Sequence, residues 1–284
     1  MSLNDITCRF GSAHTSGGGV LDDVDIHFQP INDVSDIPTV IGFEALGRKN
    51  GVTGLQSIGP FIDEIHAMGL RPELELRTLE KACCFLRSCD RVLQPDQAES
   101  VYVTVNLHPE TLMQQGLLDE IETAIDEYPG ARSRIRFEIL EHEFPEEAEE
   151  DIVENIRGLS EAGYLLYLDD FGDTPGQDEH RMDMLLPYVY GVKLSGSLWE
   201  REPDERESFL SSLYDAGGHD KVIVVEGVEN DDHLAETRTM SEKYGFEKVY
   251  AQGWHPLLGA SMTPESAMSV LGLTELRILE KMPG

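Results

Sequence analysis

Short hydrophobic runs alternate along this chain with longer segments in which hydrophobic residues recur at helical spacing. The short runs are rich in β-branched and aromatic residues and have the length of strands. They lie at about 25–31, 40–46, 101–107, 134–140, 164–169, 189–195, 221–226 and 246–252. The helical spacing occurs at about 60–68, 74–86, 109–127, 147–162, 204–216, 231–244 and 263–271. The pattern predicts an α/β protein with eight strands.

The connections between these strands predict the topology. The turn from Asn32 to Pro38 is too short for a helix, so the first two strands are expected to pair antiparallel. The later strands alternate with helices and are expected to be parallel. Eight strands without an intervening linker favour one (β/α)₈ barrel over two small domains. We expect a flexible lead-in at 1–24, the barrel domain at 25–272, and a tail or extra helix at 273–284.

The charge of the chain is strongly acidic. Fifty-four acidic residues against 22 basic ones give a net charge of −32. Such a surface repels nucleic acid and anionic membranes, which argues against both as partners. The acidic residues are spread over the predicted helices, which favours a solvated surface over a binding tail, and we hypothesise a salt-loving source. The chain has no long apolar stretch, no secretory signal and no paired zinc-type cysteine spacing, so we expect a cytoplasmic protein.

Polar side chains stand at or near the carboxyl ends of most predicted strands. They are Glu44, Asn106, Glu138 with Glu141, Asp169 with Asp170, Lys193, Glu226 with Glu229, and Gln252. In a barrel these ends meet at one mouth, where barrel active sites lie. A single acidic residue at a strand end usually caps the next helix, but so many converging positions favour a shared site.

The chemistry of these side chains points to hard metal ions. Carboxylates crowded in a partly buried mouth stay ionised together only if cations lie among them. Oxygen ligands without clustered histidine or cysteine favour Mg²⁺ or Mn²⁺. The adjacent Asp169 and Asp170 suit a two-metal site, which can hold the attacking and leaving oxygens of a phosphodiester. Lys193 has two interpretations, as the group that orients the attacking water or as a salt bridge that holds the acids together.

A set of short motifs carries a more specific signal through its order along the chain. The motifs are Phe28-Gln29-Pro30-Ile31, Glu44-Ala45-Leu46-Gly47-Arg48, Val105-Asn106-Leu107, Glu138-Ile139-Leu140-Glu141, Asp169-Asp170-Phe171-Gly172, Lys193, Glu226-Gly227-Val228-Glu229 and Gln252-Gly253. In this order they resemble the EAL-domain family, the cyclic di-GMP phosphodiesterases, from about residue 25 to 262. The resemblance implies a modified TIM (β/α)₈ barrel with one antiparallel strand, which opens cyclic di-GMP to linear pGpG with Mg²⁺ or Mn²⁺.

The resemblance also implies a role for each matching residue. Glu44, Asn106, Glu138 and Asp169 would bind one metal ion, and Asp169, Asp170 and Glu226 the second. Lys193 would serve the nucleophilic water, Glu141 would brace the loop after Asp170, and Glu229 would help complete the catalytic site. Gln29, Arg48 and Gln252 would lie on the substrate side.

The chain departs from the family in two places. After Asp169-Asp170-Phe171-Gly172 the family continues with a threonine-glycine-tyrosine-serine type of loop that contributes to metal positioning and dimer contact, whereas residues 173–180 here differ. Two residues after the lysine the family has aspartate, and here Ser195. Three functions therefore stay open, namely an active phosphodiesterase, a catalytically impaired cyclic di-GMP receptor or signalling adaptor, and a protein adaptor that has lost the nucleotide. The expected partners are a cyclic dinucleotide, a second copy in a homodimer, and a sensor or regulator acting in trans.

Overall fold

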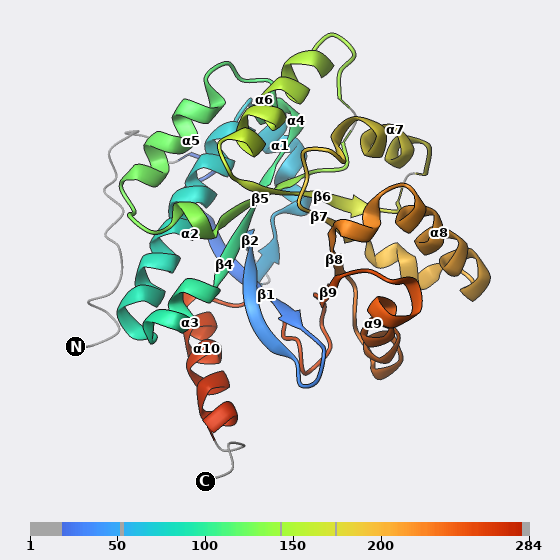
Figure 1. The fold of residues 1–284 in the computed structure, drawn as a ribbon. Helices are drawn as coiled ribbons and strands as arrows, with labels where there is room; N and C mark the ends of the chain where they lie inside the picture. Colours follow the sequence, from blue (N-terminus) through green and yellow to red (C-terminus); the bar gives the residue numbers. More distant parts are fainter. Residues whose placement is uncertain (1–18, 52–53, 143, 174, 280–284) are drawn as a thin grey trace.

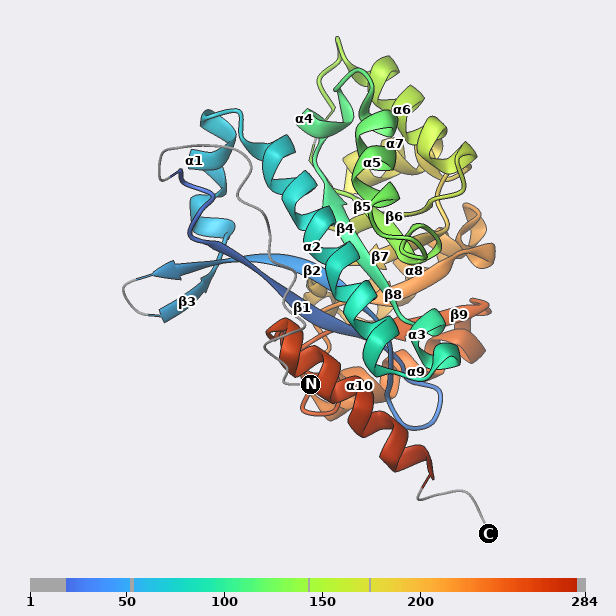
Figure 2. The same ribbon diagram turned by 90° about the vertical axis from the view of Figure 1, so that its left-hand side faces the viewer.

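The fold is seen in a computed structural model that describes residues 19–51, 54–142, 144–173 and 175–279 (Figure 1). Its strands are β1 Val24–Asp33, β2 Thr39–Gly51, β3 Gly54–Ser57, β4 Tyr102–Leu107, β5 Ile135–Ile139, β6 Leu165–Phe171, β7 Gly191–Leu194, β8 Val222–Val225 and β9 Lys248–Ala251. All eight strands expected from the sequence are confirmed. The addition is β3, which pairs antiparallel with the end of β2, and the two extend from the barrel as a hairpin (Figure 2).

Strand pairing closes the sheet into a barrel. Within the described residues the sheet order is β1-β9-β8-β7-β6-β5-β4-β2-β3, and β1 also pairs with β2. The first strand is antiparallel to both of its neighbours, β2 and β9. The pairs from β2–β4 round to β8–β9 are parallel. The expected modified TIM barrel with one antiparallel strand is therefore confirmed.

Helices cover the outside of the barrel (Figure 1). They are α1 Ile62–Ala67, α2 Arg71–Val92, α3 Pro95–Ser100, α4 Pro109–Leu112, α5 Leu117–Asp126, α6 Glu149–Glu161, α7 Pro175–Leu185, α8 Pro203–Asp215, α9 Asp231–Tyr244 and α10 Pro264–Leu279. Short 3₁₀ turns lie at Gly59–Phe61, Arg132–Arg134, Gly196–Glu200 and Gly218–Asp220. None of the helices in the described ranges is both long and apolar enough to cross a bilayer.

Two helical segments differ from the sequence prediction. The helix expected at 109–127 is divided into α4 and α5, because Gly116 adopts φ 78° and interrupts the helical path. The segment after β6, expected as a loop, contains α7. Proline at its first position suits a helix start, since proline lacks the N–H that would be unpaired there.

Large side chains fill the half of the barrel that is nearer the amino ends of the parallel strands. The guanidinium of Arg136 lies 3.4 Å from the ring centre of Tyr102 and donates to the hydroxyl of Tyr167 at 2.7 Å. Both tyrosines lie beside glycines on the neighbouring strands, Tyr102 beside Gly42 and Tyr167 beside Gly191. A Cβ atom at either glycine would lie within 2.6 Å of the ring. These glycines thus make room for the rings that close the barrel below the site.

Candidate active site

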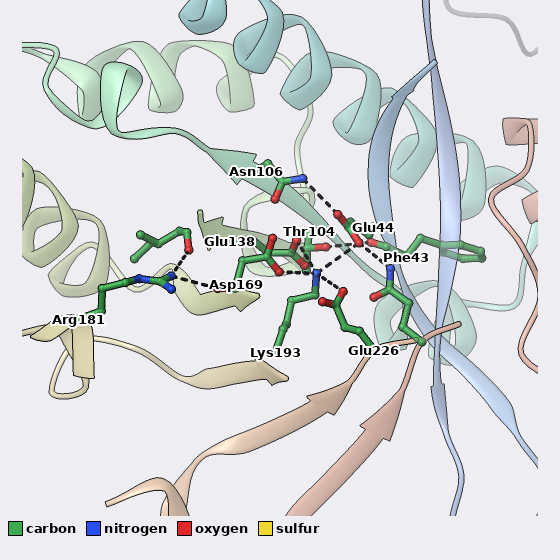
Figure 3. Close-up of polar contacts among 11 residues, drawn as sticks. Phe43, Glu44, Thr104, Asn106, Glu138, Asp169, Arg181, Lys193 and Glu226 are labelled. Atoms are coloured by element: carbon green, nitrogen blue, oxygen red, sulfur yellow. Dashed lines mark hydrogen bonds and ion pairs between the residues drawn. The ribbon is translucent and has the colours of Figure 1, made fainter. Parts of the chain in front are cut away.

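Four ionisable side chains point into the barrel in the layer above the tyrosines. Alternate residues of a strand share a face, so Glu138 follows Arg136 and Asp169 follows Tyr167 on the inner side of the barrel. Glu44 from β2 and Lys193 from β7 complete this layer (Figure 3). The sequence placed each of these residues near a strand end, and the closed barrel brings them together.

Lys193 is the centre of this cluster. Its Nζ lies 2.7 Å from Asp169 Oδ1, 2.9 Å from Glu138 Oε2, 2.9 Å from Glu226 Oε1 and 3.3 Å from Glu44 Oε2 (Figure 3). The lysine is 1% exposed and Glu138 is fully buried. Each buried carboxylate therefore depends on the ammonium group, because burying an unpaired charge costs several kcal/mol.

Two amide side chains hold Glu44. Asn106 Nδ2 donates to Glu44 Oε1 at 3.1 Å, and Gln252 Nε2 donates to Glu44 Oε2 at 2.5 Å. Burial acts to raise the pKa of Glu44, but Lys193 and these hydrogen bonds together hold that pKa below its ordinary value. Glu44 is therefore ionised at neutral pH.

The other acids of the cluster are harder to ionise. Burial, followed by the negative charge of Glu44, raises the pKa of Glu138 well above its ordinary value. Burial raises the pKa of Glu226 in the same way, and Lys193 only partly opposes it. The pKa of Asp169 is also raised by burial. One ammonium group is not enough positive charge for this set of carboxylates.

A bulge at the end of β6 places two consecutive aspartates on one side. Leu168 pairs with Val192 and Phe171 with Leu194, so β6 carries one residue more than β7 in this interval. Asp170 takes up the difference with φ 46°, in the left-handed region. In a regular strand neighbouring side chains point to opposite faces, whereas here oxygen atoms of Asp169, Asp170 and Glu141 lie within 4.8 Å of one another.

Crowding changes the acidity of Asp170. Burial, then the charges of Asp169 and Glu141, raise the pKa of Asp170 to about 7. A carboxylate with this pKa is only half ionised near neutral pH, and a neighbouring cation would favour its charged form.

The sequence profile of the EAL domain matches residues 20–255. The chain belongs to the EAL domain family. A Pseudomonas aeruginosa protein, cyclic di-GMP phosphodiesterase NbdA, is 30% identical over 152 residues, which are 53% of this chain and 19% of that protein. The matched segment therefore spans about a fifth of this relative's length.

Solved EAL structures share the fold. The EAL enzyme Bd1971, bound to cAMP and cyclic di-GMP, has a TM-score of 0.74 at 18% identity, covering 88% of this chain and 65% of that one. The PaMucR phosphodiesterase in complex with c-di-GMP has a TM-score of 0.70 at 22% identity, covering 87% and 94%. The Pseudomonas aeruginosa FimX EAL domain bound to c-di-GMP has a TM-score of 0.63 at 17% identity, covering 84% and 91%. At these identities the likeness establishes the architecture of the EAL barrel.

The remaining residues expected at the EAL site lie at different distances from the cluster. Gln29 stands opposite Glu44 in the antiparallel β1–β2 ladder, so the two side chains share a face. Arg48 lies four residues further along β2 and donates from Nη2 to Ser261 Oγ at 2.8 Å. Glu229 is exposed, and among the described contacts none joins it to the cluster. Its catalytic role stays a prediction.

Arg181 is a site residue that the sequence analysis missed. Its side chain is 2% exposed, and Nη2 donates to the backbone oxygens of Ile139 at 2.9 Å and Asp169 at 3.1 Å (Figure 3). It thereby fixes the ends of β5 and β6, which carry the acids of the cluster. No sequence signal pointed to it, because it lies in α7, a helix that was not predicted, just after the altered segment 173–180.

Unpaired oxygen atoms show what the EAL site is suited to hold. Within the described residues, Asn106 Oδ1, Glu138 Oε1 and Gln252 Oε1 are buried and have no hydrogen-bond partner. Buried oxygens of this kind are costly unless a donor or cation satisfies them. Oxygen-rich donor sets favour Mg²⁺ or Mn²⁺, so the residues present fit hard divalent cations.

Proposed function

We propose that this EAL domain is a phosphodiesterase that uses Mg²⁺ or Mn²⁺ to hydrolyse cyclic di-GMP to linear pGpG. The observation that carries the proposal is the convergence of Glu44, Glu138, Asp169 and Glu226 on Lys193, with unpaired oxygens left over. Such crowding of acids is unfavourable in a folded protein without cations, and it is the arrangement that a two-metal hydrolase requires.

The proposed ligands fall into two groups that share one residue. Glu44, Asn106, Glu138 and Asp169 would hold one cation, and Asp169, Asp170 and Glu226 the other. When bound, the cations would supply Lewis-acid polarisation of the phosphodiester. The bulge at Asp170 supports the sharing, because it lets consecutive aspartates face the same side.

The protein residues would act on the water and the substrate. The Lys193 ammonium would orient the attacking water and offset the charge that develops on the phosphate oxygens. Arg48 would add positive charge on the substrate side, where a chain of net charge −32 otherwise repels a dinucleotide. Glu141 would brace the segment after Asp170, and Gln29 with Gln252 would line the substrate side. Glu229 would complete the rim.

A second candidate function is a cyclic di-GMP receptor that does not turn its ligand over. Ser195 in place of the family aspartate and the altered segment after Asp170 favour it. In addition, Lys193 Nζ lies within salt-bridge distance of Glu138 and Asp169, which agrees with its alternative role of holding the acids together. Binding without product formation is the signature of this alternative.

Chromatography of the nucleotides separates the two functions. Purified protein is incubated with cyclic di-GMP and Mn²⁺ in molar salt, and bound and converted nucleotide are both measured. The phosphodiesterase yields pGpG, and Glu44→Gln abolishes it while the exposed control Glu147→Gln does not. Tight binding of nucleotide that is recovered intact supports the receptor. Neither binding nor product would leave only a protein adaptor.

We also propose a cytoplasmic protein that works with a second copy of itself or with a sensor in trans. The absence of a membrane-crossing helix among the described residues and the acidic surface agree with this setting. Light scattering at molar salt, with and without cyclic di-GMP, measures the assembly state directly, and a monomer under both conditions would remove the homodimer.

A further inference from the structure

The two departures from the family motif meet in space. Ser195 lies just beyond β7, two residues after Lys193, and its Oγ donates to Asp173 Oδ1 at 2.6 Å. Asp173 lies just beyond β6, at the start of the altered segment. The backbone joins the same two strand ends, since Ser195 N donates to Phe171 O at 3.1 Å. The carboxylate missing at position 195 is thus matched by one that the neighbouring strand end supplies.

The Ser195 hydroxyl makes a second hydrogen bond, as an acceptor. Ser197 N donates to Ser195 Oγ at 3.2 Å, which uses an acceptor position of the hydroxyl. The single hydroxyl proton points to Asp173 Oδ1, so the serine is the donor and the aspartate the acceptor. Ser195 is 4% exposed, and a buried donor of this kind has a fixed orientation.

The turn that carries Asp173 is also held in place. Gly172 N donates to Asp178 Oδ2 at 2.9 Å, and Asp178 is buried beside Arg181. Gly172 adopts φ 115°, a conformation that favours glycine, and Arg201 donates to its carbonyl oxygen. Asp173 itself is exposed, so a fixed turn presents its charge at the rim of the site.

This charge lies on the Asp170 side of the cluster. Asp173 N is 3.5 Å from Asp170 O. The turn therefore places Asp173 beside the strand end that carries Asp170, with its side chain held there by Ser195.

We propose that Asp173, oriented by Ser195, takes over the position of the family's aspartate after the lysine and acts as a positioning residue for Asp170 and its water. This inference rests on the proposed phosphodiesterase function. Ser195 and the changed segment then form one coupled substitution, in which a carboxylate has moved from the end of β7 to the end of β6. The loss of the family aspartate is compensated and does not by itself predict an inactive protein.

The coupling makes a non-additive prediction. Ser195→Asp alone would set two carboxylates side by side at the 2.6 Å contact and force repulsion. Asp173→Asn alone would remove the charge. The double variant Asp173→Asn with Ser195→Asp would restore one carboxylate at the family position, with an amide as its partner.

The test compares these three variants with wild type and with Asp183→Asn, an exposed aspartate on α7 that serves as matched control. The turnover number and KM for cyclic di-GMP are measured with Mn²⁺, and Mn²⁺ affinity is measured separately without nucleotide. Partners of metal ligands typically change activity or metal affinity by about 10- to 100-fold when removed. We expect each single variant to lose about tenfold in turnover number and several-fold in Mn²⁺ affinity, with KM nearly unchanged. The double variant is expected to regain most of both.

Two results would overturn the inference. One is an Asp173→Asn variant that equals Asp183→Asn in turnover number and Mn²⁺ affinity. The other is a double variant no better than the weaker single variant, although thermal unfolding shows it to be folded. A wild-type protein that makes no pGpG would contradict the proposed function. The Mn²⁺ affinities of wild type and the three variants would still decide the coupling between Asp173 and Ser195.

Discussion

The raised pKa of Asp170 predicts that cation binding depends on pH in the neutral range. Burial and its acidic neighbours raise its pKa to about 7. A cation requires the ionised carboxylate and therefore competes with the proton. Affinity should rise as pH increases through this pKa and level off above it. Between about pH 6 and pH 8 the ionised fraction rises about tenfold, which corresponds to about 1.4 kcal/mol of binding free energy.

The raised pKa values of Glu138 and Glu226 act in the same direction, so tenfold is a lower bound for the change. Calorimetric titration with Mn²⁺ in molar salt, at both pH values, measures it. Asp170→Asn should bind the second cation weakly at each pH and lose the part of the pH dependence due to Asp170. Equal Mn²⁺ affinity of the wild-type protein at the two pH values would refute the reasoning.

Three further predictions concern stability, each measured by equilibrium unfolding. Burial raises the pKa of Glu75 to about 8. The stability that the protonated Glu75 contributes is therefore fully present below the pKa of the unfolded chain and is lost as pH rises through about 8. Between about pH 6 and pH 9 the free energy of unfolding should fall by on the order of 2 to 3 kcal/mol because of Glu75. Glu75→Gln should largely remove this pH dependence, and an unchanged pH dependence in the variant would contradict the raised pKa. A Cβ at Gly253 would lie 2.2 Å from Val228 O, so Gly253→Ala should destabilise by about 1 to 3 kcal/mol. A Cβ at Gly158 on α6 would meet no atom within 4 Å, so Gly158→Ala should stabilise the protein by about 0.5 to 1 kcal/mol. Equal effects of Gly253→Ala and Gly158→Ala on the free energy of unfolding would contradict the packing around the two glycines. The net charge of −32 predicts lower stability at low salt than at molar salt, and equal stability in both would remove the hypothesis of a salt-loving source.

The sequence predicted the barrel and most of the cluster for a physical reason. Strands buried in a barrel are short continuous hydrophobic runs, so these runs reveal where each strand lies. Because parallel strand ends of a barrel converge, Glu44, Glu138, Asp169 and Lys193 could be expected to meet before any contact was known. The antiparallel β1–β2 pair followed from the short turn between the strands.

The features that the sequence did not predict depend on register and long-range contact. The bulge that turns Asp170 to the side of Asp169 is a mismatch between β6 and β7, visible only when both strands are aligned. Arg181 acts through backbone oxygens 12 and 42 residues away. The contact of Ser195 with Asp173 joins two strand ends. In the sequence alone the two positions are two separate departures from the family motif.

Cation-dependent cleavage of cyclic di-GMP tests the central claim most directly. The protein is freed of metal with a chelator, mixed with cyclic di-GMP in molar salt, and followed over time for pGpG before and after Mn²⁺ is added. We predict no product before the addition and steady formation after it, with Glu44→Gln silent throughout. Product that forms equally well in the chelator, or none after Mn²⁺ is added to folded protein, would contradict the account.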